Sequence, residues 1–255
     1  MSKIYDALRK AENEKNRKRA TPARGRPPSR KIDAHRDSGL LRGMDENFRR
    51  ALLTLRNTIE SETKERNTRS IVFTSAVGGE GKTTILSAFA RVLSIGRGER
   101  ILLVDCSIRK PKLHKLFDVD NDKGIIDYLE GRAELPEIVH HVESAGLDLV
   151  TAGFAEDVDI SMPVFNSERM TLFMREVSEA YEYVLFDTAA VLEAPETPII
   201  SSYSDGVIMI VHVGKTRREV IKRAMLMIEK LEGRFIGTIL NRKKYHIPEF
   251  IYRRV

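Results

Sequence analysis

The residues best suited to chemistry lie between Ala76 and Thr84, a glycine-rich stretch whose fixed end is Gly81-Lys82-Thr83. Glycines let consecutive backbone N–H groups point into one concavity, and a helix that begins beside them adds its positive end. Such a concavity fits a polyphosphate, with Lys82 reaching the β- and γ-phosphates and the Thr83 hydroxyl binding Mg²⁺. The pattern therefore predicts a P-loop that uses ATP and Mg²⁺. The predicted nucleotide-binding residues are Gly78, Gly79, Glu80, Gly81, Lys82, Thr83 and Thr84.

A P-loop also needs a carboxylate from a neighbouring strand to hold the metal. Two apolar runs end in aspartate, Ile101 to Asp105 and Tyr183 to Asp187. Ligands of open parallel sheets sit at the carboxyl ends of the strands, so we expect both aspartates beside the P-loop. We assign Asp187 to the metal. We assign Asp105 either to accepting a proton or to contacting the metal through a water bound to it. The plainer alternative is that each aspartate starts a turn.

The elements that must position these residues alternate between strands and helices. Apolar runs such as Ile101-Leu102-Leu103-Val104 indicate strands buried on both faces, and the alternation predicts an α/β fold with a mostly parallel sheet and helices on both faces. A helix is expected over 44–62 from its apolar stripe, and another over 216–232, where Thr216 and Glu219 suggest a capping box. The strands are expected at 70–75, 100–105, 147–151, 182–187, 206–213 and 235–240.

Charge divides the chain unevenly. The whole chain has a net charge of +6, but residues 1–42 carry 13 Lys or Arg against 5 Asp or Glu, so the remainder is slightly acidic. Residues 1–14 read as a short amphipathic helix and 15–42 as a basic, disordered linker, which leaves 43–255 as the P-loop domain. A basic arm can bind anionic lipid, nucleic acid or an acidic partner, or can be solvated only. No apolar run approaches the roughly 20 residues needed to cross a bilayer, and the opening residues do not look like a signal peptide.

Together these motifs resemble the bacterial tyrosine kinases (BY-kinases) of the CpsD/CapB group, a branch of the MinD/ParA-like P-loop ATPases. The resemblance rests on the P-loop, on Asp105-Cys106-Ser107-Ile108-Arg109 as a "Walker A-prime" strand end, and on Asp187 as the Walker B aspartate. It implies a catalytic set of Lys82, Asp105, Asp187 and Arg109. It also implies metal ligation by Thr83, Asp187 and Asp105, and a contact between Asn241 and the adenine.

The sequence departs from this family in several places. Ser107 replaces a second aspartate, and the family's oligomerisation motif on the helix before the P-loop has Leu52 at its third position. The C-terminal tyrosine cluster is missing, which leaves Tyr245 and Tyr252 as acceptor candidates, with Tyr5 as a third. Val77 stands where MinD/ParA proteins carry an extra lysine, which favours the kinase branch.

The resemblance implies an ATP-dependent protein-tyrosine autokinase that acts in exopolysaccharide or capsule synthesis and export. Two alternatives stay open at this point, a nucleotide-dependent ATPase switch without tyrosine transfer and a non-catalytic scaffold. All three imply a cytoplasmic protein at the inner face of the membrane, working with a membrane protein of the chain-length-determinant type. The basic arm could add contact with anionic lipid, and a homo-oligomer is possible. Nucleic acid is disfavoured because the arm does not interleave aromatic residues with its basic ones, as base stacking would require.

Overall fold

The computed structural model describes residues 45–65, 69–95, 98–153 and 164–242. The two segments predicted for the N-terminal arm, a helix at 1–14 and a linker at 15–42, lie outside these residues, as do Tyr5, Tyr245 and Tyr252. Ten of the described elements frame the site: α2 (Glu46–Glu62), β1 (Arg69–Ser75), α3 (Lys82–Ser94), β2 (Ile101–Cys106), β4 (Leu147–Val150), α8 (Glu168–Ala180), β5 (Tyr183–Thr188), β6 (Gly206–His212), α10 (Arg218–Glu229) and β7 (Phe235–Asn241). The smaller elements are α4 (Leu113–Phe117), α5 (Ile125–Leu129), α6 (Leu135–Ile138), β3 (Val139–Val142) and α9 (Glu196–Ser202).

The strands form one seven-stranded sheet in the order β3-β4-β2-β5-β1-β6-β7. Every neighbouring pair is parallel except β3 with β4, which is antiparallel. The mostly parallel α/β sheet expected from the sequence is therefore confirmed. β3 was not expected, because it is only four residues long and half of it is His140 and His141.

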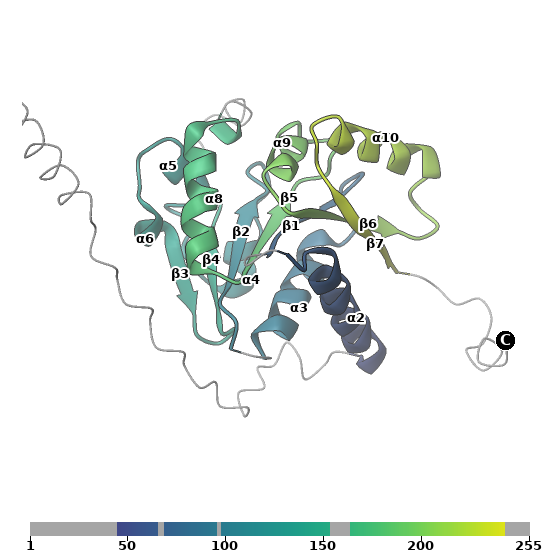
Figure 1. Ribbon diagram of the computed structural model, residues 1–255, viewed down its shortest axis with the longest axis horizontal. Helices are drawn as coiled ribbons and strands as arrows, with labels where there is room; N and C mark the ends of the chain where they lie inside the picture. Colours follow the sequence, from purple (N-terminus) through teal and green to yellow (C-terminus); the bar gives the residue numbers. More distant parts are fainter. Residues whose placement is uncertain (1–44, 66–68, 96–97, 154–163, 243–255) are drawn as a thin grey trace, which may run out of the picture. The chain divides into compact units, whose positions relative to one another are not determined.

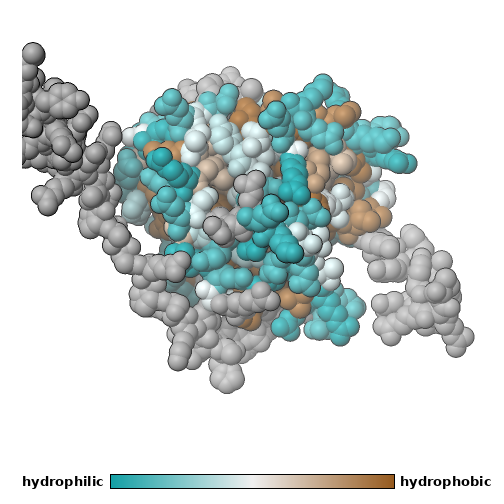
Figure 2. Space-filling model, viewed as in Figure 1, coloured by the Kyte–Doolittle hydropathy of each residue, from teal (hydrophilic) through white to brown (hydrophobic). Residues whose placement is uncertain are grey.

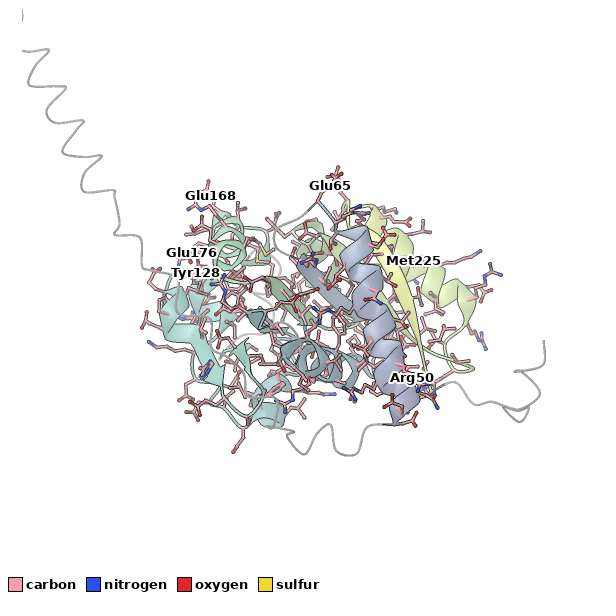
Figure 3. All side chains as sticks on the ribbon, turned by 60° about the horizontal axis from the view of Figure 1, so that its bottom comes forward. Arg50, Glu65, Tyr128, Glu168, Glu176 and Met225 are labelled. Atoms are coloured by element: carbon pink, nitrogen blue, oxygen red, sulfur yellow. The ribbon has the colours of Figure 1, made fainter. Side chains whose placement is uncertain are left out.

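Helices cover both faces of the sheet, as Figure 1 shows. Consecutive residues of β1 point to opposite faces, so Ile71 and Phe73 pack with α2 and α3 while Val72 packs with the helices of the other layer. In that second layer, Tyr128 of α5 lies beside α8 and donates a hydrogen bond to Glu176 at 3.0 Å (Figure 3). The central strands are thus buried on both sides, which explains their continuous apolar runs.

Helix α2 packs on α3 with one face and is exposed on the other. Asp45 caps its first turn by accepting a hydrogen bond from the Phe48 N–H. Glu46 and Arg50 form an exposed ion pair, and Arg50 is labelled on this helix in Figure 3. Leu52, by contrast, is only 2% exposed, so the third position of the family's oligomerisation motif faces the core of this chain.

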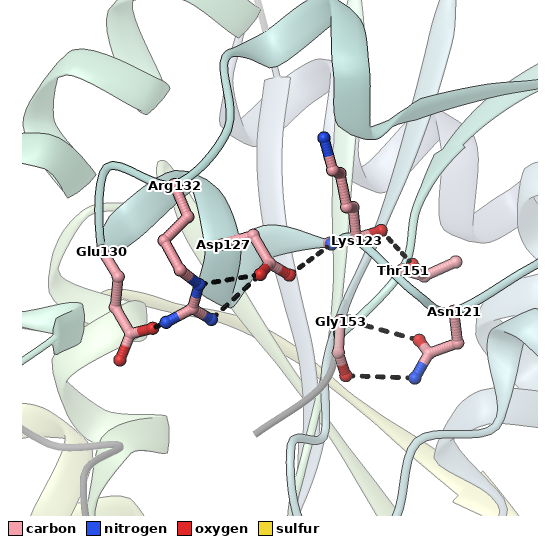
Figure 4. Close-up of polar contacts among 8 residues, drawn as sticks. Asn121, Lys123, Asp127, Glu130, Arg132, Thr151 and Gly153 are labelled. Carbon is pink, nitrogen blue, oxygen red and sulfur yellow. Dashed lines mark hydrogen bonds and ion pairs between the residues drawn. The ribbon is translucent and has the colours of Figure 1, made fainter. Parts of the chain in front are cut away.

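The region where β4 ends is held by polar contacts, shown in Figure 4. The Asn121 side chain bonds both the N–H and the carbonyl of Gly153, and the Thr151 hydroxyl donates to the Lys123 carbonyl. Asp127 accepts from the Gly124 N–H and from Arg132. These bonds fix the carboxyl end of β4 on the edge of the sheet where the P-loop lies.

The visible surface is largely hydrophilic, with hydrophobic residues interspersed near α10 and β7 (Figure 2). Leu226 of α10 and Leu240 of β7 are more than half exposed. Among the helices that the structure describes, none combines the length and the apolar character that a membrane span requires.

Candidate active site

The glycine-rich stretch forms the connection between β1 and α3, as its sequence context predicts. Gly79 and Gly81 have φ angles of 78° and 97°, which a residue with a side chain adopts only with strain. Gly81 is also the N-cap of α3, and no side chain of the described residues caps the first N–H groups of this helix. These free donors, together with the positive end of the helix, suit the loop to binding an anion.

Asn241, at the end of β7, lies against the P-loop. Its side-chain amide donates to the Glu80 carbonyl at 2.7 Å, and a Cβ on Gly81 would clash with the same nitrogen. The expected contact between Asn241 and an adenine stays a prediction. The observed bond shows that Asn241 braces the loop, and that Gly81 must lack a side chain to let it do so.

Glu80 has its side chain turned into the fold rather than toward the phosphate concavity. It is 1% exposed and accepts hydrogen bonds from the Thr216 hydroxyl at 2.6 Å, the His212 N–H at 3.0 Å and the Val77 N–H at 3.3 Å. Its contribution to a nucleotide would therefore come from its backbone. The same contact corrects the expected capping box, because Thr216 bonds Glu80 and α10 begins two residues later, at Arg218.

Asp187 lies under the P-loop, at the carboxyl end of β5. One carboxylate oxygen accepts a hydrogen bond from the Thr83 hydroxyl at 2.6 Å, and the other is buried with no hydrogen-bond partner among the residues that the structure describes. Burial and the neighbouring Asp105 raise the pKa of Asp187 to about 7, against the Thr83 bond and the charge of Lys82. A buried carboxylate oxygen with no donor, next to a threonine hydroxyl, is the oxygen donor set that Mg²⁺ prefers.

Lys82 begins α3 and faces several carboxylates. Burial lowers the pKa of its ammonium group, while Asp187 and Glu193 are the two largest influences that favour the charged form. An ammonium held in this way carries positive charge into a partly desolvated site, where its attraction to a phosphate is stronger than in water.

Asp105 is adjacent to Asp187 across the β2–β5 register, so the structure brings the two predicted aspartates together. Asp105 is fully buried, and its two oxygens accept hydrogen bonds from the N–H groups of Ser107, Lys112 and Leu113 at 2.9–3.0 Å. Burial raises its pKa, and these three donors oppose that rise. The carboxylate thus organises the loop after β2. This geometry favours the turn-starting alternative over a proton-accepting role.

Arg109 points to a carboxylate of its own chain. Its guanidinium Nη1 lies 3.0 and 3.2 Å from the two oxygens of Glu196, the first residue of α9. The Glu196 side chain has no exposed surface, whereas that of Arg109 is one-third exposed. Arg109 thus forms an ion pair within the chain, and its catalytic role stays a prediction.

Glu193 is a residue that the sequence analysis missed. Its side chain is exposed and accepts a hydrogen bond from the Gly78 N–H at 2.6 Å, which places a carboxylate at the P-loop. The loop that carries it runs along the start of the P-loop, because the N–H groups of Val191 and Leu192 bond the carbonyls of Ser75 and Ala76. No local sequence pattern predicts this contact, because its two partners are 115 residues apart.

Three of the four tyrosines in the described residues have hydroxyls that donate hydrogen bonds to carboxylates. Tyr128 bonds Glu176, Tyr181 bonds Asp148 at 2.8 Å, and Tyr183 bonds Glu60 at 3.3 Å. Burial raises the pKa of Tyr183 to about 12 and raises that of the other two as well. These phenols are poorly placed to receive a phosphate.

Comparison with known proteins gives a consistent set of relatives. The AAA domain family matches residues 68–240. Tyrosine-protein kinase YwqD of Bacillus subtilis is 29% identical over 191 residues, which are 75% of this chain and 79% of the relative. A putative tyrosine-protein kinase in the cps region of Klebsiella pneumoniae is 24% identical over 75% of this chain. This chain covers only 26% of that relative, and a similar quarter of several others.

Solved structures show the same fold. The kinase domain of the Escherichia coli tyrosine kinase ETK superposes with a TM-score of 0.72 at 23% identity, over 78% of each chain. The septum site-determining protein MinD of Pyrococcus horikoshii, complexed with Mg-ADP, superposes with a TM-score of 0.58 at 21% identity, over 73% of this chain and 76% of that one. The expected P-loop NTPase fold, and the resemblance to bacterial tyrosine kinases and MinD-like ATPases, are confirmed.

Proposed function

This chain belongs to the AAA domain family, and from that premise we propose that it is an ATP-dependent protein-tyrosine kinase acting in exopolysaccharide or capsule synthesis and export. The observation that carries the proposal is the Thr83–Asp187 pair beneath an intact P-loop, with one buried Asp187 oxygen left for a metal. The names of the relatives support the phosphotransferase, and the cps region of one of them supports the polysaccharide context.

Each part of the site has a task in this proposal. The backbone N–H groups of the P-loop and the Lys82 ammonium bind the phosphates and offset their charge. Thr83 and Asp187 would hold Mg²⁺, which supplies further charge neutralisation at the phosphates when bound. Asp105 keeps the loop after β2 in place, and Glu80 keeps the P-loop in place from behind.

The acceptors in this proposal are tyrosines outside the described residues, Tyr245 and Tyr252 first and Tyr5 next. The engaged hydroxyls of Tyr128, Tyr181 and Tyr183 disfavour these three tyrosines as acceptors. A Tyr245→Phe/Tyr252→Phe variant should lose most of the phosphotyrosine and keep ATP binding. Equal labelling of this variant and the wild type would contradict the choice of acceptor.

For partners, we propose a membrane protein of the chain-length-determinant type, with the chain peripheral at the cytoplasmic face of the membrane. The basic residues of 1–42 support an added contact with anionic lipid, where each Lys or Arg contributes about 1 kcal/mol. Vesicles containing anionic lipid should therefore retain the protein at low salt and release it at high salt. Equal retention by neutral vesicles would contradict the electrostatic contact.

The function is tested with purified protein, Mg²⁺ and ATP, by immunodetection of phosphotyrosine over time. A Lys82→Ala variant serves as the control, because it removes the ammonium group and leaves the loop backbone in place. The proposal expects phosphotyrosine in the wild type and none in the variant. ATP binding or hydrolysis without phosphotyrosine would instead support the alternative of a nucleotide-dependent switch.

A further inference from the structure

Four carboxylates contact or adjoin the P-loop, and three of them are already engaged in the fold or in the metal position. Glu80 is buried and accepts three hydrogen bonds. Asp105 is buried and also accepts three. Asp187 is buried between Thr83 and the position suited to a metal. None of these three presents an oxygen to an acceptor group arriving from solvent.

Glu193 is the fourth, and it differs in each respect. Its side chain is exposed, and within the described part of the chain it accepts one hydrogen bond, from Gly78 in the loop that would surround the phosphates. A Cβ on Gly78 would lie 3.0 Å from both of its oxygens, so the carboxylate lies directly against the loop backbone. It also lies close enough to Lys82 to be the second strongest of the groups that favour the charged ammonium.

The backbone sets this position. Val191 and Leu192 bond the chain just before the P-loop, and the Glu193 N–H closes a turn by donating to the Ala190 carbonyl at 2.9 Å. The turn follows β5, the strand that ends in Asp187 and Thr188. Asp187, near the end of β5, and Glu193, in the loop that follows, therefore both contact the P-loop, Asp187 through Thr83 and Glu193 through Gly78.

We propose that Glu193 is the catalytic base of this site, the group that accepts the proton of the acceptor hydroxyl. The inference rests on the proposed function and deepens it, because it replaces Asp105 in the role first given to that residue. Glu193 would leave the Gly78 N–H to the γ-phosphate and turn its free oxygens to the hydroxyl that approaches from solvent.

The transfer balances with the groups named. The acceptor O–H bond breaks and its proton moves to a Glu193 carboxylate oxygen. The acceptor oxygen forms a bond to the γ-phosphorus, and the bond from that phosphorus to the β–γ bridging oxygen breaks, leaving its electron pair on ADP. Positioned proton acceptors of this kind contribute about 10²- to 10⁴-fold to rate.

The test compares the full-length wild type with Glu193→Gln, which keeps the shape and removes the proton-accepting charge. Glu179→Gln, an exposed glutamate on α8, is the matched control. Each protein is assayed for Mg·ATP affinity and, at saturating ATP, for the rate of γ-phosphate transfer. We expect Glu193→Gln to lower the rate at least 100-fold with ATP affinity changed less than threefold, and Glu179→Gln to change neither.

A Glu193→Gln variant that transfers phosphate within threefold of the wild-type rate overturns the inference. So does one whose rate falls only in proportion to its ATP affinity, since that result assigns Glu193 to nucleotide binding. The product of the wild type is identified in parallel. If phosphate goes to water in a Glu193-dependent way, the inference holds and the kinase proposal fails. If phosphotyrosine forms equally with and without the Glu193 charge, the kinase proposal holds and the inference fails. A wild type with no turnover overturns both.

Discussion

The contact between Arg109 and Glu196 leads to a prediction that distinguishes two roles of Arg109, an ion pair within the chain and a clamp on a phosphate. Glu196 has no exposed side-chain surface, and its two oxygens lie 3.0 and 3.2 Å from Arg109 Nη1. Replacing Arg109 by methionine keeps most of the side-chain volume but leaves a buried carboxylate without its cation. Breaking a buried pair in this way costs about 3–5 kcal/mol.

The lower end of that range applies here, for two reasons. Arg109 is one-third exposed, which weakens the pair, and Glu196 is the first residue of α9, where the helix end favours a negative charge. We therefore expect Arg109→Met to lower the free energy of unfolding by about 3 kcal/mol. Glu196→Gln removes the charge that needs a partner, so adding it to Arg109→Met should return most of that loss.

The assay is urea unfolding of the wild type, the two single variants and the double variant, without nucleotide or Mg²⁺. A double-mutant cycle should give a coupling energy above about 1.5 kcal/mol. ATP affinity lost in Arg109→Met should also recover in the double variant. Stability within about 0.5 kcal/mol of wild type for Arg109→Met, with ATP affinity lost in both variants, would refute the ion-pair reasoning and restore the phosphate clamp.

Three further predictions concern the interior of the site. The pKa of Asp187 is raised from 3.8 to about 7, so the free-energy cost of deprotonating it in the folded state grows from about pH 4 to pH 7. Urea unfolding of the metal-free protein should therefore show Asp187→Asn to be more stable than the wild type by on the order of 4 kcal/mol at pH 8, and by less at pH 5. A variant less stable than the wild type at pH 8 would contradict this. Glu80→Ala should lower the free energy of unfolding by about 2–4 kcal/mol, because the Thr216 hydroxyl and the His212 N–H lose their acceptor. Wild-type stability of this variant in thermal unfolding without nucleotide would show that the Glu80 hydrogen bonds are not needed for stability. Cys106, the single cysteine, is fully buried, and burial raises the pKa of its thiol well above the usual value. A maleimide should therefore label it only as fast as the protein unfolds. Rapid labelling in native buffer would be inconsistent with its place in β2.

The parts of the site that the sequence predicts are those set by neighbours in the chain. The P-loop needs only glycines, a lysine and a threonine between a strand and a helix, and Asp187 needs only a strand that ends beside it. The sheet follows in the same way from apolar runs of strand length. Each of these signals lies within about ten residues.

What the sequence could not predict depends on residues that only the fold brings together. The Glu80–Thr216 bond joins residues 136 apart in the sequence. Thr216 bonds Glu80 instead of forming the expected capping box, and α10 begins at Arg218. The Gly78–Glu193 bond spans 115 residues, and the Arg109–Glu196 pair spans 87. The end of an apolar strand predicts a chemical role for Asp105, but its oxygens accept hydrogen bonds from three backbone N–H groups that no local pattern indicates.

The destination of the γ-phosphate tests the central claim most directly. ATP labelled at the γ-phosphate is incubated with Mg²⁺ and the full-length protein, and label on tyrosine is counted separately from free phosphate, with Lys82→Ala as control. The account predicts label on tyrosine in the wild type that disappears in Lys82→Ala. Free phosphate alone, or bound ATP with no transfer, would contradict it and make this chain a nucleotide-dependent switch.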